Sequence, residues 1–389
     1  MNRYFSKEVT LKIKVGFPFT YTNRGGSYQS ASMIIKKLSK NKSYDIIVFL
    51  PTKGFNDDLF EFENVTVVDY NLNKKIQDKV YKSSGISRKI LSIPSQIKLY
   101  LKALRIFKQF KCDLVHINDD ASLLAWGLSA KARKIPVVWN VRQDYGNKYI
   151  DLLRKKLASH IIFNSKATSN RFKNNDLNQS IIYNLFEIPS AHQDSMSNDQ
   201  IITIGFVGTL QRRKRLEWFL KAAIFASNQF NNLRFVIAGP DYSDGEYLNQ
   251  INQTKTIIGE DSQLDYLGQV DDIYPVFQLM DIFCLTSSSE AFGRVVIEAL
   301  INNTAVIATD VGGVKEIIDD EYNGILVNPN SYEEFKVSLL ELIKDRVKRE
   351  RLANHGLNIL RDKFDPEKQI ENLMNVYNSL LESKFEKNK

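Results

Sequence analysis

Short runs of β-branched and aromatic residues alternate along the chain with segments whose apolar residues recur at helical spacing. Runs of about four to eight such residues predict buried strands, and segments such as 27–40 and 122–134 predict amphipathic helices. In the first half of the chain, the predicted strands are residues 11–17, 44–50, 64–70, 113–118, 136–141 and 160–164. Strands that alternate with helices predict a parallel, doubly wound α/β sheet.

This pattern stops once and then restarts. Residues 184–200 are polar and show no periodicity, which is typical of a linker. Asp365 and Pro366 form a good N-cap and first-turn pair for a last amphipathic helix. The strands predicted between linker and helix are residues 202–208, 233–239, 264–268, 281–287, 304–309 and 324–328. We therefore predict two Rossmann-like domains, residues 1–190 and 191–365, and a helix over 366–389 that packs back on the first domain.

The composition is that of an ordinary globular protein, with 43% hydrophobic and 25% charged residues among 389. No apolar run approaches the roughly 20 residues of a membrane-spanning helix, and the first residues mix charges with apolar positions, unlike a secretory signal. We therefore expect a cytoplasmic protein. Cys112 and Cys284 each lie in an apolar strand-like run, which favours reduced core thiols over a disulfide or a metal site.

Charge is divided unevenly between the two halves. Residues 1–199 contain 32 basic and 17 acidic residues, whereas residues 200–389 contain 21 basic and 28 acidic residues. Within the basic half, residues 74–111 carry eleven Lys or Arg and one acid, Asp78, interleaved with apolar residues. Such a stretch predicts contact with an anionic membrane surface. The alternatives are ordinary helices with a solvated basic face, or nucleic-acid binding, for which the chain lacks an aromatic-basic recognition motif.

Candidate chemistry lies in the turns that follow strands. In open α/β sheets ligands bind beyond the carboxyl ends of the strands, so we expect a ligand in the cleft between the two domains. Gly25 and Gly26 precede a predicted helix, whose first amides suit a phosphate, although a simple tight turn would look the same. Residues 212–215 are four consecutive cations after a strand. They predict a polyphosphate partner, with a solvated turn as the alternative.

A third turn combines two carboxylates with a helix start. Glu290 lies at a strand end, Gly293 lies near the start of a helix, and Glu298 follows Glu290 by eight residues. The carboxylates can accept hydrogen bonds from hydroxyls, and the first helical amides can hold a phosphate. That combination describes a nucleotide sugar. The alternative is an N-capping role for Glu290 and a solvent-facing Glu298.

The segment E-A-F-G-R-V-V-I-E, followed by T-D-V-G-G-V-K-E-I-I and N-G-I-L-V, resembles the E-x7-E region of retaining GT-B glycosyltransferases of the family 4, or group 1, type. G-F-V-G-T-L-Q-R-R-K-R-L resembles that family's phosphate loop, and D-L-V-H-I-N-D resembles its N-terminal D-x-V-H-x-H strand. The resemblance covers nearly the whole chain and is densest over residues 201–328. It implies an α/β GT-B fold, in which two Rossmann-like domains face each other across a cleft.

The resemblance also implies roles for individual residues. Glu290, Lys214 and His116 match the catalytic positions, and Glu298 matches the carboxylate that binds the donor ribose. Further donor-binding positions are Gly25, Gly26, Gly208, Thr209, Arg212, Arg213, Gly268, Val270, Phe292, Gly293 and Arg294. Acceptor-side candidates are Asn118, Asp119, Arg142 and Asp144. The chain departs from the family at Thr209, where the family's loop arginine falls, and Arg212 or Arg213 could supply that charge.

The implied reaction transfers a hexosyl group from a nucleoside-diphosphate sugar, UDP more than GDP, to a hydroxyl with retention at the anomeric carbon. It needs neither cofactor nor metal ion, since the paired acids of the chain are scattered among loops. Inversion stays open, with Asp119, Asp144 or His116 as the base. The basic half favours a lipid-linked diphosphate glycan acceptor at the inner face of the plasma membrane, in capsule, O-antigen or related polysaccharide biosynthesis. A non-catalytic nucleotide-sugar-binding scaffold is the alternative function.

Overall fold

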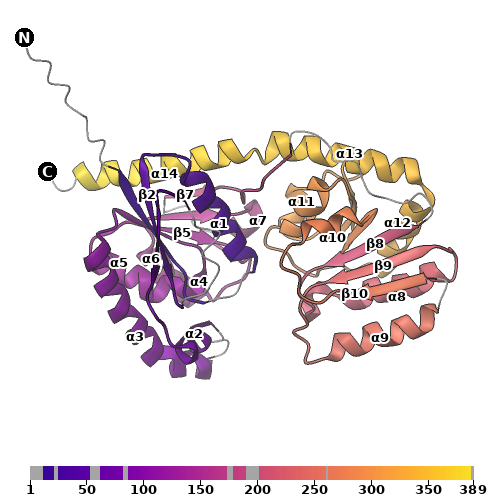
Figure 1. The fold of residues 1–389 in the computed structure, drawn as a ribbon, viewed down its shortest axis with the longest axis horizontal. Coiled ribbons are helices and arrows are strands. Elements are labelled where there is room, and N and C mark those ends of the chain that lie inside the picture. The colour runs from indigo at the N-terminus through magenta and orange to yellow at the C-terminus, as the bar shows by residue number, and fades with distance from the viewer. Residues whose placement is uncertain are drawn as a thin grey trace, which may run out of the picture. The chain divides into compact units, whose positions relative to one another are not determined.

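The structure is a computed structural model that describes residues 12–21, 25–52, 62–81, 86–172, 178–189, 201–259 and 262–386, without the side chains at 78–81, 86–92, 148, 262 and 385. It divides into two compact units (Figure 1). The N-terminal unit comprises the described parts of Met1–Asn164, Ser169–Phe186 and Pro366–Lys389, and the C-terminal unit those of Ser165–Thr168 and Glu187–Asp365. The last helix of the chain therefore belongs to the first unit.

The N-terminal unit is built on a seven-stranded sheet in the order β3-β2-β1-β4-β5-β6-β7. All of its strand pairs are parallel. Its centre, β1 and β4, is buried on both faces, as expected for strands covered by helices. The strands are β1 Ile13–Pro18, β2 Tyr44–Leu50, β3 Val65–Asp69, β4 Leu114–Ile117, β5 Val137–Val141, β6 His160–Phe163 and β7 Gln179–Ile181.

Helices cover both faces of this sheet. One face packs against α1 (Gly26–Leu38) and α14 (Pro366–Glu386). The other face packs against the helices that follow β3, β4 and β5, with Trp126 at the centre of an aromatic cluster. These helices are α2 Lys74–Tyr81, α3 Ile86–Phe110, α4 Asp120–Ser122, the π-helical turn η2 Leu123–Gly127, α5 Leu128–Ala132 and α6 Lys148–Leu157, and the short α7 is Lys166–Ser169.

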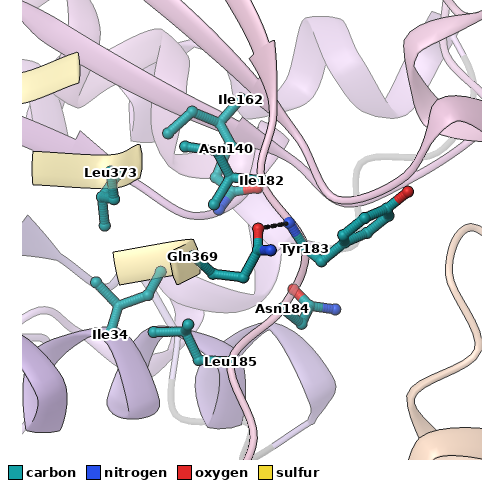
Figure 2. Close-up of a pocket in the computed structure, with 9 residues that line it drawn as sticks. All are labelled: Ile34, Asn140, Ile162, Ile182, Tyr183, Asn184, Leu185, Gln369 and Leu373. Carbon is teal, nitrogen blue, oxygen red and sulfur yellow. Dashed lines mark hydrogen bonds between the residues drawn. The ribbon is translucent and has the colours of Figure 1, made fainter. Parts of the chain in front are cut away.

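Helix α14 is tied to the N-terminal unit by apolar and polar contacts. Its side chains Ile370, Leu373 and Tyr377 are buried in the core formed with α1. Figure 2 shows the small pocket beside it, where the Gln369 side-chain oxygen accepts a hydrogen bond from the backbone N–H of Tyr183 at 3.0 Å. A chain segment more than 180 residues beyond the strand that it covers thus completes the core of this unit.

The C-terminal unit repeats the scheme with a six-stranded sheet in the order β10-β9-β8-β11-β12-β13. Its strand pairs are also parallel. The strands are β8 Ile202–Val207, β9 Leu233–Ala238, β10 Ser262–Tyr266, β11 Ile282–Leu285, β12 Ala305–Thr309 and β13 Ile325–Val327. The helices are η3 Arg212–Lys214, α8 Leu216–Ser227, α9 Glu246–Ile258, α10 Tyr274–Gln278, α11 Arg294–Ile301, η4 Val314–Glu316, α12 Tyr332–Lys344 and α13 Arg346–Lys363.

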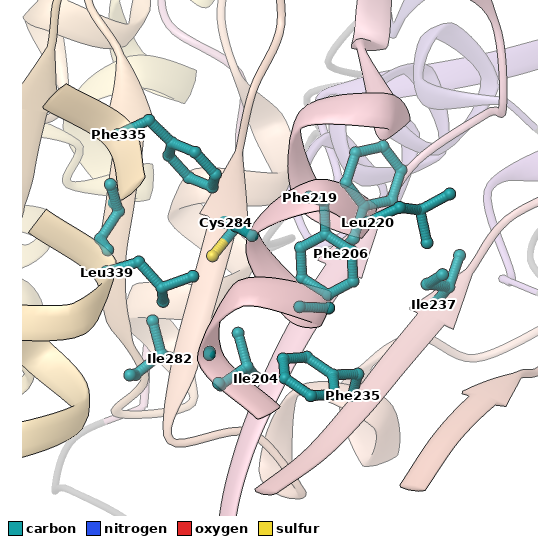
Figure 3. Packing of buried hydrophobic residues seen from close by; sticks show 14 of the residues in the cluster. Ile204, Phe206, Phe219, Leu220, Phe235, Ile237, Ile282, Cys284, Phe335 and Leu339 are labelled. Atoms are coloured by element: carbon teal, nitrogen blue, oxygen red, sulfur yellow. The ribbon is translucent and has the colours of Figure 1, made fainter. Parts of the chain in front are cut away.

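Aromatic and aliphatic side chains fill the core between this sheet and its helices. Figure 3 shows Phe206, Phe219 and Phe235 packed beside Cys284 and Leu339. Alternate residues of β8 and β9 point into this layer, which is the consequence of the two-residue period of a strand. Cys284, like Cys112 in the other unit, is buried and free, which confirms the prediction of core thiols.

The structure confirms the predicted α/β class and the parallel sheets. Every strand predicted from the sequence is present, and β7 was missed because its three residues are too short to give a periodic signal. Residues 184–189 of the predicted linker form neither helix nor strand, and residues 190–200 lie outside the described residues. Among the helices of the described ranges, none has the length and apolar character needed to cross a bilayer.

Candidate functional site

Three strands of the C-terminal sheet end in backbone contact with one another. Gly208 follows β8, and a Cβ atom there would lie 3.5 Å from Cε of Lys214. Gly239 follows β9, and a Cβ atom there would lie 2.0 Å from the carbonyl oxygen of Gly208, so only glycine fits. The N–H of Gly239 donates to the carbonyl of Gly268 after β10 at 2.7 Å. This edge therefore exposes bare backbone next to a buried lysine.

The loop of four cations is held by the residues that follow β11. The N–H of Ser288 donates to the carbonyl of Arg213 at 2.7 Å, and the Thr286 hydroxyl donates to the carbonyl of Lys214 at 2.8 Å. These bonds turn Lys214 inward, whereas Arg215 lies over the Trp218 ring, 5.0 Å from its centroid. The residues after β11, Thr286 and Ser288, therefore hold the loop so that Lys214 points inward and Arg215 points away from it.

Glu290 is the centre of this site. Its Oε1 accepts hydrogen bonds from Nζ of Lys214 and from the Ser287 hydroxyl, the latter at 2.8 Å, and Nη1 of Arg213 lies 3.4 Å away. Burial alone would raise the pKa of Glu290, but the charges of Lys214 and Arg213 outweigh it and hold the pKa below its usual value. Glu290 is therefore an ionised acceptor in a nearly dry setting.

The close approach of Gly312 fixes the backbone of Glu290. Gly312 has φ +51°, and a Cβ atom there would lie 1.6 Å from the Glu290 carbonyl oxygen. The N–H of the next residue, Gly313, donates to that carbonyl at 3.1 Å. The Gly-Gly pair after β12 thus lets two loops of the sheet edge touch. This pair lies in the segment T-D-V-G-G-V-K-E-I-I that resembles the family, but its position in the sequence alone did not predict a role at the site.

Helix α11 begins next to Glu290 and carries the second carboxylate. Gly293 caps the helix in a left-handed conformation with φ +99°, and Phe292 is buried against Phe364. Nη2 of Arg294 donates to Oε1 of Glu298 at 2.8 Å, one helical turn away. The side chain of Arg294 thus fixes the orientation of Glu298, the carboxylate that we predict to bind the donor ribose. From the sequence we expected Arg294 to act only through its backbone amide.

Tyr274 is a neighbour of Glu298 that sequence reasoning missed. Burial, and next the charge of Glu298, raise the pKa of Tyr274 to about 12. Its hydroxyl therefore stays protonated beside a carboxylate at neutral pH. The tyrosine at the start of a five-residue helix gave no periodic signal, and only the three-dimensional fold brings it near α11.

The remaining donor-side predictions lie around this edge or in the other unit. Thr209 is half-buried, with Oγ1 2.7 Å from the Gln211 side-chain amide, and Arg212 is exposed. Gly268 has φ +64° and open space where a Cβ atom would be, and Val270 is half-buried nearby in the sequence. In the N-terminal unit, Gly25 caps α1 and Gly26 is its first residue, as predicted for a helix start.

The carboxyl edge of the N-terminal sheet carries mostly neutral polar groups. Asp119 caps α4, accepting from the N–H and hydroxyl of Ser122 at 2.7 Å each, and burial raises its pKa. The Thr20 and Ser122 hydroxyls lie 2.7 Å apart. The Asp119 carboxyl group therefore holds the start of α4, and its role on the acceptor side stays a prediction.

Arg142 joins two asparagines at the same edge. Its Nη2 donates to Oδ1 of Asn118 at 2.9 Å, and its Nη1 donates to Oδ1 of Asn184. Asn118 follows β4 and Arg142 follows β5, so neighbouring strand ends bring them together. Asp144 is half-buried and lies on the loop before α6. The structure thus unites two of the acceptor-side candidates, Asn118 and Arg142, in direct contact.

His116 is buried between the sheet and α14. It has 0% exposure, its Nδ1 lies 2.5 Å from the Tyr377 hydroxyl of α14, and its ring stacks on Phe17. Burial, with a smaller contribution from Arg142, lowers the pKa of His116 to about 3. The neutral imidazole thus packs α14 against the sheet through a partner that lies 261 residues further along the chain. The catalytic role of His116 stays a prediction.

Known families match both units. Residues 187–358 match the family described as glycosyl transferases group 1, and residues 24–186 match Glycosyltransferase Family 4. The chain belongs to these glycosyltransferases. A solved structure similar to it is that of Anabaena HepE in complex with UDP and glucose, with a TM-score of 0.74, 20% identity, and coverage of 94% of this chain and 100% of that one. The two parallel-sheet units are thus those of the GT-B fold.

Several glycosyltransferases are related in sequence. One from Methanocaldococcus jannaschii, described as uncharacterized, is 30% identical over 57% of this chain and 60% of its own length. The lipopolysaccharide core biosynthesis glycosyltransferase LpsE of Rhizobium meliloti is 29% identical over 36% of this chain and 40% of its own. An α-1,4-N-acetyl-D-galactosaminyltransferase of Campylobacter jejuni, named for a diNAcBac-PP-undecaprenol glycan, is 22% identical over 90% and 94%. The matched region of the chain thus covers between two fifths and nearly all of the length of these relatives.

Proposed function

We propose that this chain is a retaining glycosyltransferase that transfers a sugar from a nucleoside-diphosphate sugar, UDP more than GDP, to a lipid-linked glycan. The observation that carries the proposal is the Lys214–Glu290 pair at the carboxyl edge of the C-terminal sheet. A cation and an ionised carboxylate held together beside bare backbone suit a ligand that combines a diphosphate with sugar hydroxyls.

The proposed roles follow from what each group can offer. Lys214 and Arg213 would face the diphosphate, and the amides at Gly293 and Arg294 would hold a phosphate oxygen at the start of α11. Glu290, once Lys214 turns to the diphosphate, would accept from a hydroxyl of the transferred sugar. Glu298 would accept from the ribose hydroxyls, with Arg294 fixing its orientation.

The proposed reaction is driven by electrostatics. The bond between the anomeric carbon and the diphosphate oxygen breaks, a bond from that carbon to the acceptor oxygen forms on the same face, and the acceptor proton passes to the departing phosphate. Negative charge develops on the leaving diphosphate, where the positive charge of Lys214 would lower the barrier most. No covalent intermediate on the protein is required.

Acceptor and pathway are argued from charge and from relatives. The basic N-terminal half suits an anionic lipid-linked diphosphate, and the Campylobacter jejuni relative is named for an undecaprenol-linked glycan. We place the reaction in bacterial surface polysaccharide biosynthesis, at the inner face of the plasma membrane, without metal ion or cofactor. Asn118 and Arg142 are the groups that we assign to the acceptor side.

One observation favours a second function. Thr209 stands where the family's loop arginine falls, which would suit a scaffold that binds nucleotide sugar without turnover. Arg213 weakens that alternative, because its guanidinium lies 3.4 Å from Glu290 and restores a second cation.

Hydrolysis of a panel of nucleotide sugars without acceptor tests the proposal. We expect slow release of nucleotide from one donor, lost in Glu290→Ala and kept in Glu217→Ala, a glutamate on the neighbouring helix α8. With an acceptor in hand, retention is read as the anomeric configuration of the product by NMR. Tight binding of a free nucleotide without release from any donor, with or without acceptor, would favour the scaffold.

A further inference from the structure

Helix α6 buries polar residues and exposes several apolar ones, unlike an ordinary surface helix. Its polar residues Asp151 and Arg154 face the protein, where Arg171 joins them: Nη2 of Arg171 donates to Oδ1 of Asp151, and Nη1 of Arg154 lies 3.0 Å from the same oxygen. Leu157 at the end of the helix is buried in the core, but Tyr149, Leu152 and Leu153 face outward, with 81%, 53% and 48% of each residue exposed. A helix normally buries its apolar stripe, so this face is built to meet something else.

The inward ion pairs make this orientation obligatory. Arg171 also donates to Oδ2 of Asp120, at the start of α4, at 2.7 Å, so the pairs tie α6 to a second helix. At Gly146, just before α6, a Cβ atom would lie 2.2 Å from Nε of Arg171 and from Oδ2 of Asp151. The helix therefore cannot rotate Leu152 and Leu153 inward without breaking buried ion pairs.

Neighbouring helices continue the exposed apolar surface. The Ser129 hydroxyl of α5 lies 2.9 Å from the carbonyl oxygen of Tyr100 in α3, and Nζ of Lys131 donates to the carbonyl oxygen of Lys156 in α6 at 2.9 Å. Helices α3, α5 and α6 thus lie side by side on one face of the N-terminal sheet (Figure 1). Their further exposed apolar side chains are Ile93, Ile97, Leu101 and Leu128. We call this surface the α3–α5–α6 face.

Charge around this face has one sign. Residues 86–110 and 128–134 contain no Asp or Glu, and in 148–157 the single acid is Asp151, which is buried and paired. Exposed basic side chains lie among the apolar ones, namely Lys98, Arg105, Lys108, Lys131, Arg133, Lys134 and Lys156. A second copy of the chain would bring like charges together, whereas an anionic lipid surface complements both the charge and the apolar side chains.

We infer that the α3–α5–α6 face docks on an anionic membrane, with Tyr149, Leu152 and Leu153 inserted at the headgroup level. The inference deepens the proposed function and rests on it for the lipid-linked acceptor. It extends the membrane contact from residues 74–111, where charge alone pointed and where α3 lies, to α6, an aromatic and leucine-bearing helix outside that stretch. The basic residues then supply long-range attraction, and the apolar ones supply anchoring.

Vesicle flotation of the full chain tests the inference, with phosphatidylcholine vesicles that contain or lack phosphatidylglycerol. We expect binding to the anionic vesicles, weakened at least about tenfold by the triple change Tyr149→Ser, Leu152→Ser and Leu153→Ser. The changes Lys98→Gln, Arg105→Gln and Arg133→Gln should weaken binding at low salt and reduce its salt dependence. The matched control is Val347→Ser with Ile257→Ser, which alters exposed apolar residues of the C-terminal unit and should change nothing.

Three results would overturn the inference. The first is unchanged flotation of the triple variant, and the second is a dimer in solution that this variant dissociates, which would make the face an interface between copies. The third is a wild-type chain that does not float with the anionic vesicles. Nucleotide release from the donor in vesicle-free solution separates this inference from the proposed function. We expect the triple variant to keep wild-type release, which also shows that it folds. If the wild-type chain releases nucleotide but does not float with anionic vesicles, the membrane contact is contradicted and the proposed function is not.

Discussion

The carboxyl edges of the two sheets differ in chemistry although their architecture is the same. In the C-terminal unit, Lys214, Arg213 and Glu290 meet beside backbone left bare by glycines. In the N-terminal unit, two asparagines bind one arginine, a threonine and a serine hydroxyl lie together, and the histidine at the edge is buried and neutral. One edge is suited to a diphosphate, and the other to hydroxyl-rich or weakly charged groups.

The difference teaches where a parallel α/β sheet gets its specificity. Both units bring the ends of neighbouring strands together, so the topology supplies the place and the side chains after each strand supply the chemistry. Thr286 and Ser287 after β11 and the Gly-Gly pair after β12 hold Lys214 and Glu290 so that they face each other. At the N-terminal edge the acid Asp120, which follows β4, is paired with Arg154 and Arg171, and these pairs tie helices to one another.

Removing the central cation should have the largest effect. Lys214→Met is expected to lower donor turnover by about 10²–10³-fold, because a positive charge no longer stabilises the leaving diphosphate. It also leaves Glu290 buried without its closest cation, which should lower the free energy of unfolding by about 3–5 kcal/mol. Nucleotide release and denaturant unfolding measure the two effects.

The double variant Lys214→Met with Glu290→Gln sharpens this prediction. It removes both charges, so we expect stability to recover by at least half of the loss while turnover stays lost. A double variant that is no more stable than Lys214→Met would show that the two groups do not interact as the structure indicates.

A smaller effect should separate the neighbouring arginines. Arg213 lies beside Glu290, whereas the Arg212 side chain is exposed. We expect Arg213→Ala to weaken nucleoside diphosphate binding about tenfold and Arg212→Ala to weaken it less than about threefold, as measured by calorimetry. Equal losses would mean that the loop acts through its total charge, and that no single arginine replaces the family residue at Thr209.

The smallest effect concerns the buried histidine of the other edge. The pKa of His116 is lowered to about 3 by burial, so between pH 6.5 and 3 the unfolded chain takes up a proton that the folded chain refuses. Stability is fully present above pH 6.5 and falls with pH by at most about 1.4 kcal/mol per unit. His116→Gln should reduce the pH dependence of the free energy of unfolding between pH 6.5 and 5. An unchanged slope there would show that His116 is protonated in the folded protein.

The sequence predicted the architecture because the strands are contiguous apolar runs and the helices have clear periodicity. It also predicted the third turn, since Glu290, Gly293 and Glu298 act within one local strand-to-helix connection. Local patterns carry this information without knowledge of the fold. The same patterns led us to predict two Rossmann-like domains and a last helix that packs on the first of them.

Long-range contacts account for what the sequence did not reveal. The burial of His116 depends on Tyr377, and the approach of Gly312 to Glu290 depends on the register of two strands. The outward face of α6 depends on ion pairs from Asp151 to Arg171, twenty residues along the chain. Each of these requires knowing which distant segment lies opposite, which neither periodicity nor spacing contains.

The most direct test of the account is calorimetric titration of UDP into the wild-type chain and into two variants, Lys214→Met and Arg142→Ala. The account places the diphosphate at the C-terminal edge, so affinity should fall at least about tenfold in Lys214→Met and stay within about twofold of wild type in Arg142→Ala. The opposite result, with binding lost in Arg142→Ala and kept in Lys214→Met, would contradict it.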